Sequence, residues 1–222
     1  MHYLKFQDIL DGMLDRGIRV FNLNDIAKLM NKPRNYASLM VNKSKKVMTI
    51  ENGRYYLKGA DIYEIASNIT RPSYVSLFSA FRYYNLTTQL PIRISVMTTK
   101  RHKSLKVEGY MIDFFTFSKD RFFGYFKERN AYIASAEKAI LDSLYLNKVP
   151  FDEIKEAMDE GVREDVINVK RLKEYALCMH SKMLVSRLIM LMQALGMDTK
   201  DLHRFSSHRS PKILGYKRGK PI

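Results

Sequence analysis

Residues 24–57 read NDIAKLMNKPRNYASLMVNKSKKVMTIENGRYYL and carry the signals of two short helices followed by a hairpin. Asn24 is expected to cap the first helix, with Asp25 in its first turn, where the helix dipole favours an acid. Asn31-Lys32 then reads as a turn, and Pro33 suits the first position of the next helix. The buried face of the first helix is predicted to consist of Ile26, Ala27, Leu29 and Met30.

The second of these helices has two chemically different faces. The predicted apolar face consists of Tyr36, Ala37, Met40 and Val41. The predicted polar face consists of Asn35, Ser38, Asn42 and Lys45. After this helix, residues 47–50 and 55–57 are predicted to form two strands joined by a type I′ turn at Asn52-Gly53.

The preceding residues complete a recognisable order of elements. Apolar residues recur at helical spacing from Leu4 to Leu14, and Gly17 is a typical helix stop. Residues 18–21 are β-branched and aromatic enough for a short strand. Helix, strand, short helix, turn, polar helix and hairpin together predict a winged helix-turn-helix over residues 6–57.

Charge is concentrated on the same segment. The chain of 222 residues has a net charge of +15, and charge of this sign favours polyanionic partners such as nucleic acid. Between residues 28 and 58 the only acid is Glu51. The basic residues there are Lys28, Lys32, Arg34, Lys43, Lys45, Lys46, Arg54 and Lys58. We therefore expect this module to bind double-stranded DNA, although winged helices also serve as protein–protein modules.

The polar helix would enter the major groove. Arg34 matches the acceptors of guanine, Asn35 matches the donor–acceptor pair of adenine, and Ser38 could reach a base or a phosphate. Lysines at the far end of the helix and Arg54 on the wing would contact phosphates. The full predicted DNA-binding set is Lys32, Arg34, Asn35, Ser38, Asn42, Lys43, Lys45, Lys46 and Arg54.

The rest of the chain predicts an α+β fold. The expected domains are residues 1–62 (the winged helix), residues 63–200 (a mixed domain with a small antiparallel sheet and a C-terminal helical bundle) and residues 201–222 (a basic tail). The predicted helices of the second domain cover residues 60–67, 72–84, 136–145, 151–158, 169–177 and 182–195. The predicted strands cover residues 92–97, 109–117, 121–126 and 132–133. The tail is either a solvated phosphate-binding arm or partly docked through Ile213, Leu214 and Tyr216.

Five segments, in this order, resemble one known family. They are NGRYYL (52–57), IASNITRPSYVSLFSAFRYYNL (65–86), PIRISVMTTKR (91–101), IASAEKAILDSLYL (133–146) and SRLIMLMQALG (186–196). The chain is similar to the AbiEi-type antitoxins, the transcriptional-regulator half of type IV toxin–antitoxin (abortive infection) pairs that act in phage defence.

This resemblance implies a repressor of its own operon. Such proteins bind inverted repeats in their own promoter through the N-terminal winged helix, with self-association on DNA. Their C-terminal domain counteracts a nucleotidyltransferase-like toxin encoded beside them, without a tight complex. The basic end of the present chain, from Lys200 onward, departs from the family pattern.

Candidate catalytic groups are few. Glu137, Lys138 and Asp142 fall on one helix, where Glu137 reads as a complement to the helix dipole and Lys138 as solvated or paired. Asp113, expected on an edge strand, is the other carboxylate that a metal-dependent nuclease could use. Neither the histidines nor Cys178 has the spacing of a zinc site. We expect no enzyme, no metal and no cofactor, with a nuclease and a protein–protein adaptor as the alternatives.

The cellular setting is also suggested by the sequence. A single cysteine fits a reducing compartment. No apolar run approaches the roughly 18 residues that a membrane span needs, and no signal peptide is evident. We expect a soluble, cytoplasmic protein that does not associate with membranes.

Overall fold

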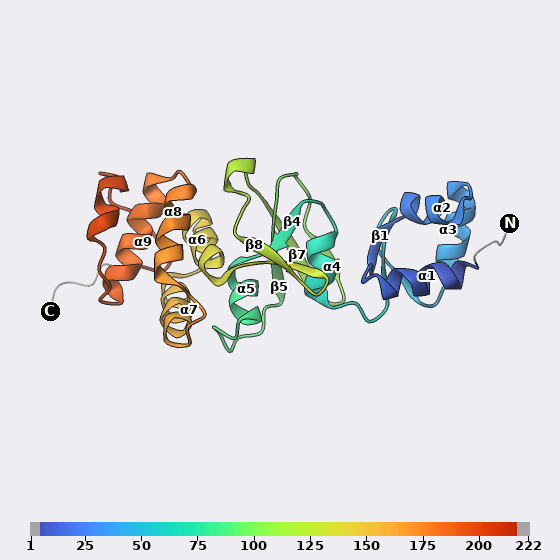
Figure 1. The fold of residues 1–222 in the computed structure, drawn as a ribbon, viewed down its shortest axis with the longest axis horizontal. Helices are drawn as coiled ribbons and strands as arrows, with labels where there is room; N and C mark the ends of the chain where they lie inside the picture. The colour runs from blue at the N-terminus through green and yellow to red at the C-terminus, as the bar shows by residue number, and fades with distance from the viewer. Residues whose placement is uncertain (1–4, 217–222) are drawn as a thin grey trace.

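The computed structural model describes residues 5–216, which form an elongated molecule of three parts in chain order (Figure 1). The first part, residues 6–57, is called here the N-terminal module. It contains α1 (Phe6–Asp15), β1 (Val20–Asn22), α2 (Leu23–Met30), α3 (Arg34–Lys43), β2 (Val47–Glu51) and β3 (Arg54–Leu57). Its three strands form a small antiparallel sheet in the order β1-β3-β2.

The core of the N-terminal module follows the helical periodicity of the sequence except at Leu29, which was predicted to be buried and is 48% exposed. Leu10 of α1, Ile26 of α2 and Ala37 of α3 are completely buried. They pack with Phe21, Val41, Tyr55 and Leu57 in one apolar cluster. The helix cap differs from the prediction: Asn22, rather than Asn24, accepts a hydrogen bond from the backbone N–H of Asp25 at 3.0 Å, so α2 begins at Leu23. Pro33 is the N-cap of α3, one position before the predicted one.

The hairpin is present but its turn is not of type I′. That turn requires positive φ at both central residues. Gly53 has φ of +76°, whereas Asn52 is not among the residues with positive φ. The register between β2 and β3 also shifts between Thr49 and Glu51, so an irregularity in the strand replaces the expected regular hairpin.

The second part is built on a six-stranded sheet with strand order β6-β7-β5-β4-β9-β8. Its elements are α4 (Ile62–Asn68), β4 (Ser73–Val75), α5 (Leu77–Tyr83), β5 (Arg93–Thr98), β6 (Leu105–Val107), β7 (Tyr110–Thr116), a 3-10 turn (Lys119–Arg121), β8 (Tyr125–Glu128) and β9 (Ala131–Ala134). The sheet is mixed, because β5 pairs with β7 and β4 pairs with β9 in parallel. The expectation of a small antiparallel sheet in residues 63–200 is therefore wrong, as is the single helix over residues 72–84, whose first residues form β4.

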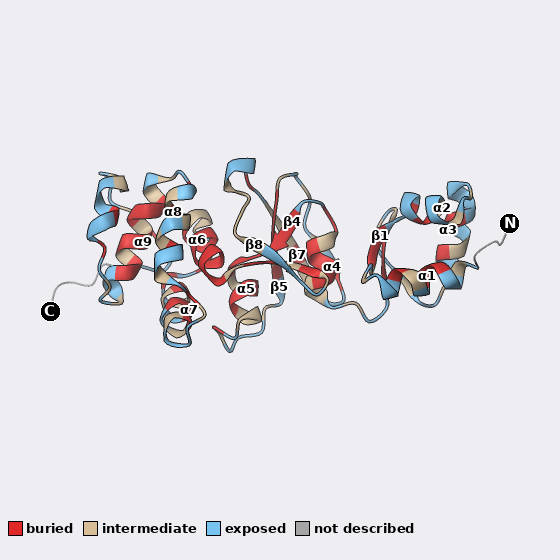
Figure 2. Cartoon of the chain, viewed as in Figure 1, coloured by how far each residue is buried: buried red, intermediate tan, exposed pale blue. Residues whose placement is uncertain are grey.

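The two faces of the central sheet are buried by different partners. Val75, Ile94 and Val96 face a cluster that includes Ile65 and Ala66 of α4. The alternate residues Tyr74 and Met97 face the opposite cluster, which contains α5 and the C-terminal helices. Figure 2 shows the buried residues along the strands and the packed helices, with exposed residues mostly at the outside of the molecule.

The third part is a helical bundle at the far end from the N-terminal module (Figure 1). It consists of α6 (Ala136–Leu146), α7 (Phe151–Arg163), α8 (Val169–Cys178), α9 (Lys182–Ala194) and a 3-10 segment (Lys200–Phe205). Ser135 caps α6 as expected, because its hydroxyl accepts a hydrogen bond from the N–H of Lys138. Among the described residues, no helix combines the length and the apolarity that crossing a membrane requires.

Part of the C-terminal segment is docked on the bundle. The carbonyl of Leu214 accepts a hydrogen bond from the N–H of Phe151 at 2.7 Å, and Ile213 is buried. The rings of Phe151 and Tyr216 are in edge contact at 4.7 Å. Residues 217–222, the last part of the predicted basic tail, lie outside the described part of the chain.

Candidate nucleic-acid interface

The outer face of α3 is polar and exposed. Arg34, Asn35, Asn42 and Lys43 are exposed, and Ser38 is half-buried. Ala37 and Val41, one turn apart, anchor the opposite face in the core of the module. The helix therefore presents donors and acceptors to the outside from a rigid support, which is what reading of base edges requires.

Two apolar side chains share this outer surface. Tyr36 is 44% exposed and Leu39 is 58% exposed. The prediction that Tyr36 belongs to the core is wrong, because the helix packs through a narrow stripe at Ala37 and Val41 only. Leu39 was not selected from the sequence, although its spacing from Asn35 and Asn42 places it between them on the same face.

The two lysines after α3 do not extend its polar face. The helix ends at Lys43, and Lys45 and Lys46 lie in the turn before β2, so the predicted helical position of Lys45 is wrong. The side chains of Lys45 and Lys46 are exposed. Nζ of Lys46 forms an ion pair with Oδ1 of Asp11 in α1 at 3.5 Å. Lys32 lies half-buried in the turn between α2 and α3.

The start of α3 is next to the hairpin turn. A side chain at Gly53 would meet Nη2 of Arg34 at 3.5 Å, and the carbonyl of Gly53 accepts a hydrogen bond from the N–H of Leu23 at 3.0 Å. Arg54 Nη1 donates to Oε1 of Glu51 at 2.7 Å and lies 3.1 Å from Nε2 of His102. Nη1 of Arg54 thus contacts both a carboxylate and an imidazole.

The opposite side of the module is fixed to the central sheet. Val20 and Tyr56 pack against Ile65 and Ile94 in the same apolar cluster. The hydroxyl of Tyr56 donates a hydrogen bond to the carboxylate of Glu108, and burial, together with that carboxylate, raises the pKa of Tyr56 to about 12. This attachment leaves α3 on the side that faces away from the sheet (Figure 1).

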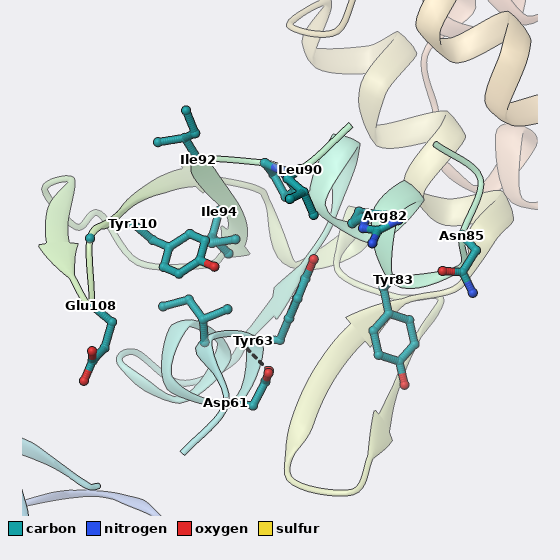
Figure 3. Close-up of a pocket in the computed structure, with 13 residues that line it drawn as sticks. Asp61, Tyr63, Arg82, Tyr83, Asn85, Leu90, Ile92, Ile94, Glu108 and Tyr110 are labelled. Atoms are coloured by element: carbon teal, nitrogen blue, oxygen red, sulfur yellow. Dashed lines mark hydrogen bonds between the residues drawn. The ribbon is translucent and has the colours of Figure 1, made fainter. Parts of the chain in front are cut away.

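A hollow of about 590 Å³ lies where residues 58–61, which connect β3 to α4, enter the central domain (Figure 3). Tyr63, Tyr83 and Tyr110 line it together with the strongly exposed Leu90 and Ile92. Burial and the nearby carboxylate of Asp61 raise the pKa of Tyr63 to about 12, so its phenol stays protonated near neutral pH.

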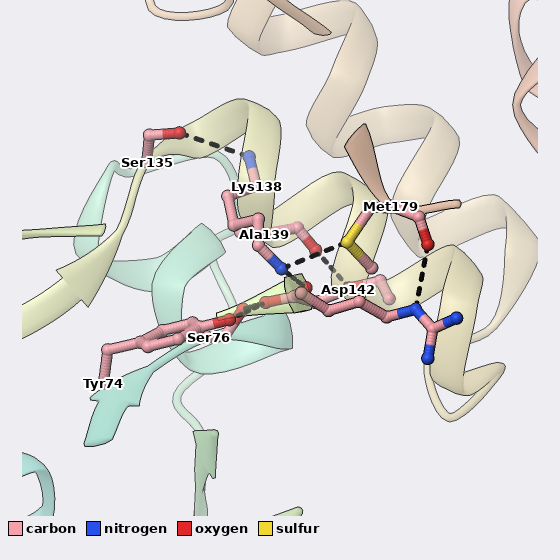
Figure 4. A network of polar contacts seen from close by, with 9 residues as sticks. Tyr74, Ser76, Ser135, Lys138, Ala139, Asp142 and Met179 are labelled. Carbon is pink, nitrogen blue, oxygen red and sulfur yellow. Dashed lines mark hydrogen bonds and ion pairs between the residues drawn. The ribbon is translucent and has the colours of Figure 1, made fainter. Parts of the chain in front are cut away.

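The residues that the sequence offered as a possible catalytic set on α6 take part in buried polar contacts. Lys138 and Asp142 form an ion pair with both side chains completely buried (Figure 4). The hydroxyls of Ser76 and Tyr74 donate to Oδ2 of Asp142 at 2.7 and 3.1 Å. Burial lowers the pKa of Lys138 and raises that of Asp142, but every polar atom of the pair has a partner. The network joins the sheet to α6.

The other two candidate carboxylates also accept hydrogen bonds, although Oε2 of Glu137 is buried without a partner among the described residues. Glu137 is buried, and its Oε1 accepts hydrogen bonds from Arg171 at 2.7 Å and from the N–H of Asn168 at 2.8 Å, so it does more than complement the helix dipole. Asp113 lies on β7, which is flanked by β5 and β6 and is not an edge strand. Both carboxylate oxygens of Asp113 receive hydrogen bonds from Arg93. Within residues 5–216, no three His, Cys, Asp or Glu side chains are grouped in a way that could hold a metal ion.

No model of a known protein family matches the sequence, and no curated protein matches it.

Sequence reasoning missed a set of basic residues beside the hairpin. Arg71, Lys100, Arg101 and Lys103 are exposed on loops of the central domain. The signal that could have found them is the run from residue 99 to residue 107, which contains no acid. Only the fold reveals that this loop adjoins the N-terminal module, through the contact of His102 with Arg54.

Proposed function

We propose that this chain is a sequence-specific double-stranded-DNA-binding transcriptional regulator, with residues 6–57 as a winged helix-turn-helix. The observation that carries the proposal is the exposed polar face of α3, with Arg34 and Asn35 at its start, next to the hairpin turn at Gly53. The strand order β1-β3-β2 beneath three helices supports it.

Base reading is assigned to the exposed face of α3, beginning at its first turn. Arg34 and Asn35 carry the side chains suited to guanine and adenine, and Leu39 provides an apolar surface for a thymine methyl group. Ser38 and Asn42 lie along the same helix, and Lys32, Lys43 and Lys45 surround it with positive charge. Lys46 and Arg54 have carboxylate partners, and these partners weaken their attraction for phosphates.

The resemblance to the AbiEi-type antitoxins narrows the proposal. From it we infer a repressor that self-associates on inverted repeats in its own promoter and counteracts a nucleotidyltransferase-like toxin. We expect a reading frame for such a toxin directly beside the gene. Its product should be toxic when expressed alone and harmless when co-expressed with this chain. Toxicity unchanged by co-expression would remove the antitoxin role and leave the regulator.

Footprinting on the DNA upstream of the gene tests the DNA-binding assignment. The full chain should protect a discrete segment. Asn35→Ala should lose discrimination at one or two base pairs, worth about 1–3 kcal/mol for a bidentate contact. Lys45→Gln should weaken binding to all sequences about equally. Protection no better than on random DNA would refute the assignment.

One observation favours a second candidate, a protein–protein adaptor. Tyr36 and Leu39 give α3 an exposed apolar surface that a protein partner could cover. An adaptor would keep its partner after Lys43→Glu, because charge would contribute little to the contact. A DNA-binding protein would lose affinity after this substitution, since like charge then faces the phosphates.

A further inference from the structure

The hollow of Figure 3 differs in charge from the chain as a whole. Asp61 and Glu108 are the two acids in its lining, and Arg82 is the one cation there. The lining therefore has one more acid than base, whereas the whole chain has a net charge of +15. Acids concentrated at a hollow of a basic protein favour a cationic ligand over an anionic one.

Four segments of the chain meet at this hollow. They are the start of α4, the end of α5, the chain before β5 and the turn between β6 and β7. Ile94 of β5 also lines the hollow and is almost completely buried. Because these segments belong to one packed domain, the hollow exists before any ligand binds, as small-molecule sites usually do.

Tyrosine rings form the aromatic part of the lining. Figure 3 shows the hydroxyl of Tyr110 directed toward the ring of Tyr63. Burial is the main cause that raises the pKa of Tyr63 to about 12, and burial also raises the pKa of Tyr83. These two phenols are therefore uncharged near neutral pH. The face of a phenol ring is negative and attracts a cation that lies within about 6 Å of its centroid.

Two apolar side chains beside the rings are left uncovered. Leu90 and Ile92 both line the hollow and are each 75% exposed. Among the described residues, they are the most exposed of the large apolar side chains. Apolar surface next to a few polar groups is typical of a site for a small molecule. A ligand with an apolar body would cover these side chains while its charge meets the carboxylates.

The two carboxylates are held in place and can still accept from a ligand. Oδ1 of Asp61 accepts a hydrogen bond from the N–H of Tyr63 at 2.8 Å, and Oε1 of Glu108 accepts one from the hydroxyl of Tyr56. Within residues 5–216, the second oxygen of each carboxylate has no hydrogen-bond donor. Both acids are exposed, so a ligand in the hollow can reach these oxygens.

We propose that this hollow is a binding site for a small organic cation with an aromatic or apolar body. The two carboxylates stabilise the charge of the ligand, and its body lies against the tyrosine rings. The volume of about 590 Å³ is within the range of about 300–1,000 Å³ that is usual for such sites. This inference goes beyond the proposed function and does not require that the chain bind DNA.

Isothermal titration of the full chain with methyltriphenylphosphonium tests the site, with triphenylphosphine oxide as a neutral probe of nearly the same shape. The cation should bind at one saturable site at about 0.15 M salt. The neutral probe should bind at least about fivefold more weakly, because it has no charge for the carboxylates and the ring faces to attract. Equal binding of the two probes, or no saturable binding of the cation, would overturn the inference.

A pair of double variants locates the binding. Asp61→Asn with Glu108→Gln removes both charges, while the amide oxygens can still accept the same hydrogen bonds within the chain. This variant should bind the phosphonium about 5- to 20-fold more weakly. Glu174→Gln with Asp198→Asn removes two exposed carboxylates from the helical bundle and should bind like the wild type. Equal affinities of the two double variants would place the cation elsewhere and overturn the inference.

Two further substitutions test the signs of the individual contacts. Arg82→Gln should tighten binding of the phosphonium about two- to fivefold, because a like charge is removed from the lining. Tyr110→Leu should weaken binding, whereas Tyr110→Phe, which keeps the ring, should leave it near that of the wild type. Weaker binding by Arg82→Gln, or equal affinities of the two Tyr110 variants, would contradict the inference.

Discussion

The hydroxyl of Tyr56 on β3 donates a hydrogen bond to the carboxylate of Glu108, 52 residues further along the chain. Glu108 lies in the turn between β6 and β7 with a positive φ of 50°. Together with the burial of Val20 against α4, this contact fixes the N-terminal module to the central sheet. The orientation of α3 relative to the central domain depends on that attachment.

Tyr56→Phe should lower the free energy of unfolding by about 0.5–1.5 kcal/mol, because it removes the hydrogen bond to Glu108, whose exposed carboxylate can then take donors from water. Tyr55→Phe is the matched control, since Tyr55 is equally buried on the same strand and its hydroxyl has no hydrogen bond within the described residues. Urea denaturation measures both. Equal losses for the two variants would contradict the role of the contact.

Lys138→Met should be strongly destabilising. The substitution leaves the carboxylate of Asp142 buried without its cation, and breaking a buried pair in this way costs about 3–5 kcal/mol. The free energy of unfolding from urea denaturation is again the measurement.

The double variant Lys138→Met with Asp142→Asn is the control for this prediction. The amide oxygen of asparagine can still accept the hydrogen bonds of Ser76 and Tyr74, and no unpaired charge remains. The double variant should therefore be more stable than Lys138→Met alone. If the two unfold at the same urea concentration, the loss comes from packing and the charge argument is wrong.

The stability of the chain should depend on the ionisation of Glu64. Burial raises the pKa of this carboxyl above its ordinary value of 4.5, although Arg19 lies 3.8 Å away and opposes the shift. A raised pKa means that the folded chain holds the proton more tightly than the unfolded chain does. The stability that this provides is complete below pH 4.5 and is lost as the pH rises through the raised pKa.

Glu64→Gln isolates this effect, because glutamine does not ionise. The free energy of unfolding of the wild type, relative to this variant, should fall as the pH is raised from about 4 to about 7. Urea denaturation at several pH values provides the comparison. A difference that rises with pH would show that Arg19 outweighs burial and that the pKa is lowered.

The N-terminal module was predictable because its signals are local. Capping residues, Pro33 and Asn52-Gly53 each act within a few positions, and the helices and strands of this segment are found within one to three residues of the predicted bounds. The exposure of Tyr36 was not predictable in this way. It depends on how narrow the contact of α3 with its neighbours is, which is a property of the packing.

The central domain was harder for a physical reason. Tyr74 and Val75 are both completely buried, one on each face of the sheet, so β4 shows no alternation between apolar and polar residues. Its apolar run merged with that of α5. The parallel pairs of β4 with β9 and β5 with β7 join residues far apart in sequence and leave no local signal. Burial of Lys138 likewise depends on an aromatic surround that includes Phe117 and Phe123.

The most direct test of the account is the ratio of two affinities of the unmodified chain at about 0.15 M salt, one for a duplex from upstream of its own gene and one for a random duplex of the same length. A sequence-specific regulator should prefer the first by at least about a thousandfold. The preference should fall when Arg34 and Asn35 are both replaced by alanine. A ratio near one for the unmodified chain would contradict the account, because its basic surface alone would then explain any binding.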